Sequence, residues 1–181
     1  DMGAGSGSAY VFDASSGNQL AKLTPSDGAS WHCFGRSVAI SGSTIVVGAY
    51  RDDDKGTYSG SAYVFDASGT QLAKLTASDG AAYDYFGDSV AISGSTVVVG
   101  AHYDDDKGTS SGSVYVFDGT TGAQLNSWAN GDQIFDSMFG WSVAMSSDGA
   151  WLVVGAPGGS GANETGSAFV FDVPSDTASS T

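Results

Sequence analysis

The sequence predicts an all-β protein built from four-stranded antiparallel blades of a β-propeller, on three observations. A phrase ending in Val-Phe-Asp occurs four times, at residues 8–13, 61–66, 113–118 and 167–172, so its starts lie 53, 52 and 54 residues apart. Phe-Gly (34–35, 86–87, 139–140) and Gly-Ala (48–49, 100–101, 155–156) recur in phase with it. All acidic residues except Glu164 are aspartate, which favours turns over helices. A period of this length in short strand-like runs is typical of propeller blades or another all-β array.

One repeat contains four predicted strands. Residues 61–66 (SAYVFD) alternate between two apolar faces, as expected for a sheet that is packed on both sides. A turn leads to residues 71–76 (QLAKLT), a half-polar strand in which Lys74 is typical of an exposed edge. Residues 88–93 (DSVAIS) and 96–101 (TVVVGA) then form a tight hairpin, and the run of valines places its second strand between neighbouring sheets.

The repeats divide the chain, which has about 13 predicted strands. We expect the outer strands of a first blade at 1–25, repeats at about 26–77, 78–129 and 130–173, and a Ser/Thr-rich linker or tail at 174–181. Closed propellers need about four to eight blades, so about three and a quarter cannot close a ring. We therefore expect a partial or multi-chain propeller, completed by flanking sequence or another chain, or an open stacked array.

The strongly negative net charge of the chain makes some classes of binding partner unfavourable. The formal net charge is −14, with 20 acidic and six basic residues, so nucleic acid and anionic membrane surfaces are not expected to bind. No apolar run is long enough to span a bilayer. The chain lacks an initiator Met and a signal-peptide pattern, so we expect a mature or excised segment. Cys33 is the only cysteine, and it is either a buried small side chain or a reactive thiol.

The order Phe-Gly, Ser-Val-Ala, hairpin, Val-Val-Gly-Ala and Gly-Ser-Ala-Tyr-Val-Phe resembles the FG-GAP repeat over about residues 3–173. That repeat builds the seven-bladed propeller head of integrin α subunits and many microbial surface proteins. Only 155–157 reads Gly-Ala-Pro in full. Integrin-type repeats often carry a calcium loop between the Phe-Gly strand and the Gly-Ala-Pro strand. Here that position holds Ser-Gly-Ser-Thr or Ser-Ser-Asp-Gly, so the family's calcium site is absent where it is expected.

Two acidic loops follow the Gly-Ala strands and are the candidate metal sites. Their carboxylates are Asp52, Asp53 and Asp54, and Asp104, Asp105 and Asp106. Hard cations such as Ca²⁺ need several oxygen ligands, and the Gly after each loop permits a turn that converges them. Adjacent aspartates point in different directions, however, and a neighbouring Lys competes for them. We expect either solvated acidic loops or Ca²⁺ sites, and Ca²⁺ is the one cofactor considered. A further Asp recurs seven residues before each Phe-Gly (Asp27, Asp79, Asp132), as a turn former.

The sequence predicts no enzyme activity. His32 and His102 do not occupy matching repeat positions, and no Ser-His-Asp order, His-Glu-x-x-His run, Cys-x-x-Cys pair or phosphate-binding loop is present. Aromatic residues in or beside the loops are better candidates for ligand contact with protein or carbohydrate, or they wedge between blades. They are Trp31, Tyr50, Tyr58, Tyr83 and Tyr103. Asn163 lies in an N-glycosylation sequon, which indicates a secreted glycoprotein.

These observations favour an extracellular or cell-surface module for adhesion or binding, which recognises protein or glycan through its loops. One alternative is a structural building block of a surface filament or a large extracellular assembly. Another is the non-catalytic repeat domain of a larger secreted hydrolase. In each case, other copies or other chains are expected to complete the blade array.

Overall fold

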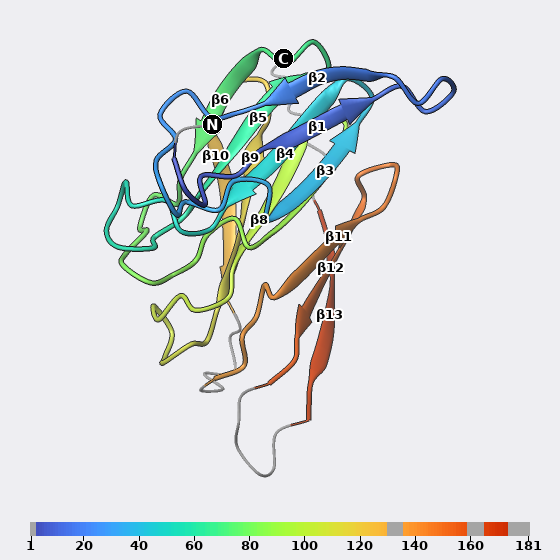
Figure 1. Cartoon of the computed structure of the whole chain (residues 1–181). Helices are drawn as coiled ribbons and strands as arrows, with labels where there is room; N and C mark the ends of the chain where they lie inside the picture. The colour runs from blue at the N-terminus through green and yellow to red at the C-terminus, as the bar shows by residue number, and fades with distance from the viewer. Residues whose placement is uncertain (1–2, 130–135, 159–164, 174–181) are drawn as a thin grey trace, which may run out of the picture.

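The structure is a computed structural model that describes residues 3–129, 136–158 and 165–173, and these residues form thirteen strands and no helix. The strands make four antiparallel sheets that follow one another along the chain (Figure 1). The strands are β1 (Ala9–Phe12), β2 (Gln19–Leu23), β3 (Ser37–Ser41), β4 (Thr44–Ala49), β5 (Ser61–Asp66), β6 (Gln71–Leu75), β7 (Ser89–Ser93), β8 (Thr96–Ala101), β9 (Ser113–Asp118), β10 (Gln124–Ala129), β11 (Ser142–Met145), β12 (Trp151–Ala156) and β13 (Ser167–Asp172). The all-β prediction is confirmed. Within the described ranges, no helix is long and apolar enough to cross a membrane.

Two complete four-stranded blades lie in the middle of the chain. Strands β3 to β6 form one blade and β7 to β10 form the next, each in the order of the sequence. Strands β1 and β2 form a two-stranded sheet, and β11 to β13 form a three-stranded one. The first strands of successive blades lie against each other, β3 on β7 and β7 on β11, so the blades stack through these strands. The predicted four-stranded antiparallel blade is therefore confirmed in both complete sheets.

The repeated phrases fix the same register in each blade. Thr44 of β4 lies opposite Asp66 of β5, and Thr96 of β8 lies opposite Asp118 of β9. The residues of these four strands are buried except at one end. A strand that is covered on both faces has no polar side to present to water, which explains why the valine runs do not alternate with polar residues.

Each Phe-Gly pair joins two neighbouring blades through its backbone. The Phe86 N–H donates to the Ser59 carbonyl of the preceding blade at 3.0 Å, and the Gly87 N–H donates to the Gly100 carbonyl of its own blade at 3.0 Å. The Phe34-Gly35 and Phe139-Gly140 pairs repeat both hydrogen bonds. We call each such pair and its partners a Phe-Gly joint.

Side chains reinforce the Phe-Gly joint. The Phe86 ring is buried and packs edge-on against Tyr115 and Phe117, with ring centroids 5.6 and 5.8 Å away. Gly60, in the preceding blade, allows the backbones to approach, because a Cβ added there would lie 2.0 Å from the Phe86 carbonyl oxygen. Its φ of 85° also favours glycine. The glycine before the Val-Phe-Asp phrase is therefore a requirement of the joint.

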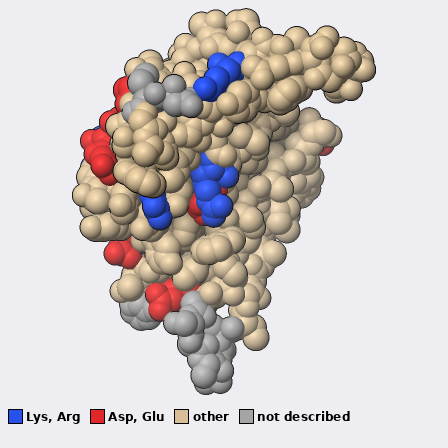
Figure 2. Space-filling view, viewed as in Figure 1, with Lys and Arg blue, Asp and Glu red and all other residues tan. Residues whose placement is uncertain are grey.

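The two incomplete sheets expose apolar side chains that the complete blades bury. Tyr10 and Phe12 of β1 occupy the repeat positions of Tyr63 and Phe65, but Phe12 is 57% exposed and Phe65 only 1%. In the last sheet the exposed apolar side chains include Trp151, Val153 and Val170. Figure 2 shows the acidic residues mainly on the side of the loops and a largely uncharged surface over the strands.

Because Phe65 is buried and Phe12 is exposed, replacing each with alanine should change the free energy of unfolding by unequal amounts. Phe65→Ala should lower the free energy of unfolding by about 3–5 kcal/mol, because it leaves a cavity in a packed core. Phe12→Ala should cost about 1 kcal/mol or less, because about half of that ring already contacts water. Chemical denaturation of both variants checks this, and similar losses would contradict the burial seen here.

Candidate functional site

The two acidic loops lie on the same side of the molecule, between β4 and β5 and between β8 and β9 (Figure 1). Each loop closes on itself through a backbone bond, from the Gly60 N–H to the Asp52 carbonyl at 2.8 Å and from the Gly112 N–H to the Asp104 carbonyl at 3.0 Å. The middle aspartate of the first loop, Asp53, accepts a hydrogen bond from the Tyr58 N–H at 2.8 Å, and the second loop repeats this bond. The three carboxylates of a loop therefore have different environments, and only the first is buried.

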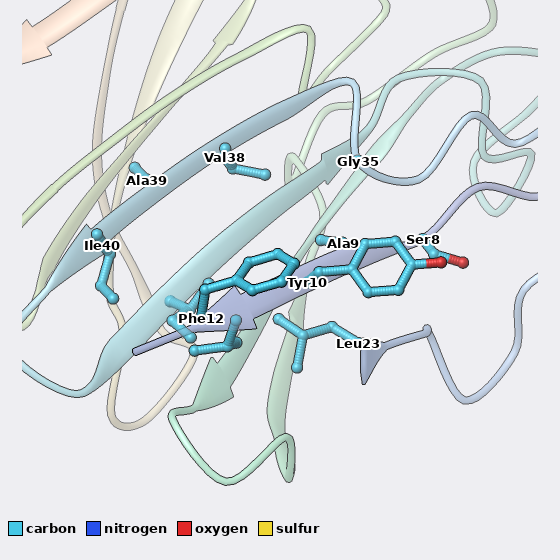
Figure 3. A pocket seen from close by; sticks show the side chains of 11 residues that line it. Ser8, Ala9, Tyr10, Phe12, Leu23, Gly35, Val38, Ala39 and Ile40 are labelled. Atoms are coloured by element: carbon cyan, nitrogen blue, oxygen red, sulfur yellow. The ribbon is translucent and has the colours of Figure 1, made fainter. Parts of the chain in front are cut away.

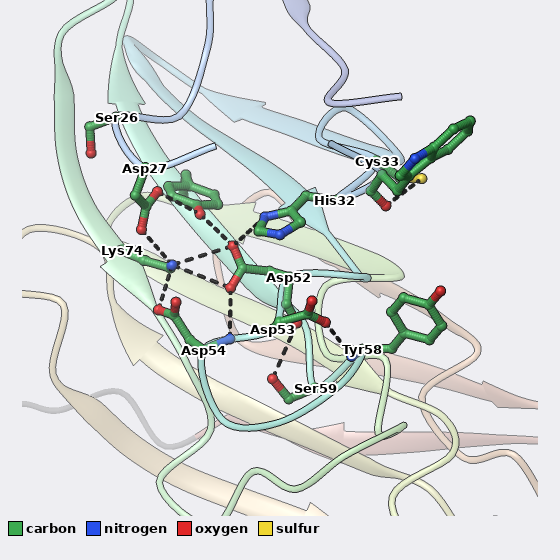
Figure 4. A network of polar contacts seen from close by, with 12 residues as sticks. Ser26, Asp27, His32, Cys33, Asp52, Asp53, Asp54, Tyr58, Ser59 and Lys74 are labelled. Atoms are coloured by element: carbon green, nitrogen blue, oxygen red, sulfur yellow. Dashed lines mark hydrogen bonds and ion pairs between the residues drawn. The ribbon is translucent and has the colours of Figure 1, made fainter. Parts of the chain in front are cut away.

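Lys74 of β6 lies among the carboxylates of the first acidic loop and offsets part of their charge (Figure 4). The Lys74 Nζ lies 2.6 Å from Asp27, 3.3 Å from Asp52 and 2.5 Å from Asp54. The Asp52 carboxylate also accepts the Tyr63 hydroxyl at 2.9 Å. Burial opposes the charge of Lys74, but the hydrogen bonds to Asp27 and Asp54 raise its pKa. Lys74 is thus the counterion of an acidic cluster, a role that its expected place on an edge strand did not reveal.

The second acidic loop has the same carboxylates and no such lysine. The Tyr115 hydroxyl donates to buried Asp104 at 2.5 Å, as Tyr63 donates to Asp52. Lys74 lies opposite Tyr63 in the β-ladder, and the residue opposite Tyr115 is Ser127. Burial and the charges of Asp104 and Asp79 raise the pKa of Asp106. The first loop therefore has an ammonium group that offsets part of its negative charge, and the second loop has none at the equivalent position.

Asp84 lies near this second acidic loop, and its pKa is raised chiefly by burial. Its carboxylate is buried and accepts a hydrogen bond from the Ala81 N–H at 2.6 Å. Burial raises the pKa of Asp84 to about 6; the hydrogen bond from Ala81 opposes the rise, and the charges of Asp104, Asp106 and Asp105 add to it. Among the residues that the structure describes, no three His, Cys, Asp or Glu side chains are grouped to hold a metal ion. Ca²⁺ binding by the two loops stays a prediction.

Four of the five expected aromatic residues lie in one group, which we call the tyrosine cluster: Tyr50, Tyr58, Tyr83, Tyr85 and Tyr103. Tyr85 connects the others, with ring centroids 5.4 Å from Tyr50, 6.0 Å from Tyr58 and 5.4 Å from Tyr103. Tyr83 packs edge-on against Tyr58 at 5.9 Å. Trp31 lies elsewhere, over the backbone of Gly5. Sequence reasoning missed Tyr85, although it stands two residues after Tyr83 and directly before a Phe-Gly pair.

Cations and a buried histidine border the tyrosine cluster. The Arg51 guanidinium lies 5.0 Å from the Tyr50 ring centroid and 5.3 Å from that of Tyr58, where the cation–π attraction is favourable. His102, which is buried, lies 4.5 Å from the Tyr103 ring and 4.7 Å from that of Trp141. Burial lowers the pKa of His102, although the charge of Asp88 opposes this. The cluster therefore combines aromatic faces, a guanidinium and a ring that is neutral at pH 7.

The tyrosine cluster spans a Phe-Gly joint and uses left-handed backbone. Tyr58, Tyr83 and Tyr85 have φ values of 57°, 72° and 56°, a region that costs a non-glycine residue about 1–2 kcal/mol. Hydrogen bonds between the blades hold them there, from the Tyr83 N–H to the Thr57 carbonyl at 2.8 Å and from the Tyr85 N–H to the Tyr58 carbonyl at 3.1 Å. The other joints have the same backbone with other residues, including Trp31 and Cys33. The left-handed backbone is therefore a feature of every repeat, and in one joint the residues at these positions are tyrosines.

The remaining predicted residues have other environments. His32 Nδ1 lies 3.1 Å from Asp52, so this histidine belongs to the first acidic loop. Cys33 is half-buried, and its thiol donates to the Trp31 carbonyl at 3.3 Å. Asn163 and residues 174–181 lie outside the described residues, so glycosylation and the linker remain predictions.

Comparison with known protein families finds the FG-GAP repeat three times, at residues 18–65, 70–117 and 130–171. No curated protein sequence matches the chain. Among solved structures, 177 chains are similar. One is Kuenenia stuttgartiensis hydrazine synthase, with a TM-score of 0.61 and 17% identity over 91% of this chain. The match spans 40% of that chain, and at this identity the likeness concerns the fold alone.

Lys74 and Ser127 occupy equivalent positions beside the two acidic loops, so exchanging lysine and serine there should change the free energy of unfolding in opposite directions. Lys74→Ser should lower the free energy of unfolding by about 2 kcal/mol, because it leaves Asp52 buried without its charged partner. Ser127→Lys should raise it by about 1 kcal/mol by supplying the second loop with an ammonium group. Thermal and chemical denaturation measure both changes. Lys55→Ser, on an exposed side chain, is the control and should have little effect; a destabilising Ser127→Lys would contradict the interpretation.

The raised pKa of Asp84 predicts a pH effect with a definite sign. The folded-state pKa of about 6 exceeds the reference value of 3.8, so the folded state gains stability from this group as the pH falls from above 6 toward 4. Asp84→Asn keeps an acceptor for the Ala81 N–H and removes the titration. At pH 7.5 this variant should be more stable than the wild type by about 1–2 kcal/mol, after allowance for solvent screening. At pH 4 the difference should be close to zero, and an equal difference at both pH values would exclude Asp84 as the cause.

Proposed function

The chain belongs to the FG-GAP repeat family, and from this premise we propose that it is a binding module that recognises a protein or glycan at the tyrosine cluster. It acts outside the cell or at the cell surface, as the integrin-type and microbial surface repeats that it resembles do. Its contribution is recognition, without chemistry of its own. The tyrosine cluster is the observation that supports this proposal.

The tyrosine cluster suits recognition because its rings are rigid and accessible. Tyr83 is 55% exposed, and the other four tyrosines are partly buried, so each presents some ring surface while its neighbours hold it. Tyrosine offers a large contact area with few rotatable bonds, and its hydroxyl can hydrogen-bond a polar ligand. Arg51 adds a fixed positive charge in a strongly acidic chain. A protein or glycan ligand that offers flat apolar patches beside hydroxyl or carboxylate groups fits this surface.

A second candidate function is assembly with other copies or chains that complete the blade array. It is favoured by the apolar side chains exposed at both incomplete sheets, among them Tyr10 and Phe12 on β1 and Trp151 and Val170 on the last sheet. Such side chains are usually covered when blades stack. This candidate concerns the sheets, whereas the tyrosine cluster lies in the loops.

Substituting Tyr83 with glycine distinguishes an effect on ligand binding from an effect on protein stability. Tyr83→Gly removes a ring from the cluster and relieves a positive φ, so the free energy of unfolding should stay the same or rise by up to about 1 kcal/mol. Binding to a panel of immobilised glycans and extracellular proteins should weaken about tenfold or more, the loss expected for an aromatic anchor.

Trp31→Gly is the matched control, because Trp31 has the same repeat position, a φ of 71° and 60% exposure but lies outside the cluster. It should relieve the same strain and leave binding unchanged. Equal binding by wild type and Tyr83→Gly, or an equal loss in Trp31→Gly, would count against the cluster as the recognition site.

A further inference from the structure

Arg51 carries a positive charge that no carboxylate of the described residues neutralises. Its guanidinium lies against the rings of Tyr50 and Tyr58 and forms no ion pair or hydrogen bond with the part of the chain that the structure describes. Its Nε is buried, and buried polar atoms normally have a partner. The neighbouring Arg36, by contrast, is paired with Asp88 at 2.7 Å. The Arg51 guanidinium is therefore available to an anionic ligand.

The hydroxyl groups of the tyrosine cluster are available as well. In the cores of the two complete blades, Tyr63 and Tyr115 donate their hydroxyls to buried aspartates. None of the five hydroxyls of the cluster has a hydrogen-bond partner within residues 3–129, 136–158 and 165–173. Each of these hydroxyls can donate and accept a hydrogen bond, so a ligand rich in hydroxyl groups suits this surface.

The backbone beside the cluster is already hydrogen-bonded. The Thr57 and Tyr58 carbonyls accept the N–H groups of Tyr83 and Tyr85. The Tyr58 N–H donates to the Asp53 carboxylate. A peptide that binds by adding a strand needs a row of unpaired backbone groups, which this segment does not offer. Rings, hydroxyls and a guanidinium remain, and these groups recognise a sugar better than an extended peptide.

The carboxylates that border the cluster limit the charge of the ligand. Asp53 lies beside Tyr58, and Asp88 lies beside Arg36, whose guanidinium is 5.6 Å from the Tyr50 ring centroid. The chain as a whole has a formal net charge of −14. A ligand with many acidic groups would be repelled, whereas a single carboxylate in contact with Arg51 would be attracted at short range.

The groove between β1 and β3 lacks these properties (Figure 3). Apolar or small side chains line it, among them Tyr10, Phe12, Val38 and Ile40, and none of its described lining residues is charged. A carboxylate that entered this groove would lose its water without gaining an ionic partner, which is unfavourable. An acidic ligand is therefore expected at the tyrosine cluster and not in the groove.

We propose that the tyrosine cluster binds a glycan through one carboxylated sugar, a uronic or a nonulosonic acid, whose carboxylate pairs with Arg51. This rests on the proposed recognition function and adds the class of ligand. The apolar face of the sugar packs against the tyrosine rings, of which Tyr83 is the most exposed, and its hydroxyls bond to the tyrosine hydroxyls. The guanidinium binds the carboxylate through two parallel N–H donors.

Matched ligands test the carboxylate on the full chain. Oligosaccharides that end in glucuronic acid or in N-acetylneuraminic acid are compared with the same compounds after reduction of the carboxylate to an alcohol. At least one acidic ligand should bind about tenfold or more tightly than its reduced form, as expected for a charge-assisted contact. Whichever acid is preferred identifies the uronic or the nonulosonic class.

Three variants test Arg51 as the partner of the carboxylate. Arg51→Gln should bind the acidic ligand and its reduced form equally. Arg51→Lys keeps the charge but loses the planar pair of donors, so it should retain only part of the preference. Lys55→Gln is the control, because it removes the same charge from an exposed residue of the same loop and should leave the preference unchanged. The ratio is measured within one protein, so a change in stability does not mimic the effect.

Equal binding of an acidic ligand and its reduced form by the wild type would overturn the proposal, as would equal preferences in Arg51→Gln and Lys55→Gln. Tighter binding of acidic peptides than of acidic sugars would also overturn it and would assign the site to a protein partner. If neutral glycans or proteins bind and Tyr83→Gly abolishes this, recognition at the cluster stands while the carboxylated sugar is excluded. If no ligand binds, both proposals fail.

Discussion

The Phe-Gly joint is the interaction on which the rest of the structure depends. The phenylalanine N–H bonds to the preceding blade, the glycine N–H bonds to its own blade, and the phenylalanine ring fills the core beside both. A four-stranded sheet with two apolar faces is unstable alone, so each blade needs this contact with a neighbour. Because the joint requires close backbone approach, glycines such as Gly60 are as essential to it as the buried rings.

The same joint determines where the rings of the tyrosine cluster stand. It holds the segment before each Phe-Gly pair against the loop of the preceding blade, in a left-handed conformation that the hydrogen bonds maintain. Where that segment carries Tyr83 and Tyr85 and the loop carries Tyr58, rings from two blades meet. The left-handed backbone that the scaffold already tolerates thus positions these aromatic side chains, and loops on a rigid scaffold commonly carry binding residues.

The repeats keep one fold while their electrostatics differ. Asp52 and Asp104 are buried at equivalent positions beside Tyr63 and Tyr115, but only the first has an ammonium group within reach. A single position on the edge strand, Lys74 or Ser127, makes this difference. Functional change in such an array can therefore occur in loops and edge strands without disturbing the joints.

The sequence by itself determined the strands, their order and the blade, because each depends on local periodicity and on phrases that recur in phase. It also identified four residues of the tyrosine cluster, since Tyr50, Tyr58, Tyr83 and Tyr103 stand in recognisable loops. It did not show that Lys74 pairs with Asp52, or that Trp31 lies apart from the other aromatic residues. It also did not show that Tyr85 belongs to the tyrosine cluster. Those relations join residues from different strands and blades, and only the tertiary structure decided them, because cross-strand register and the spacing between blades set which side chains meet.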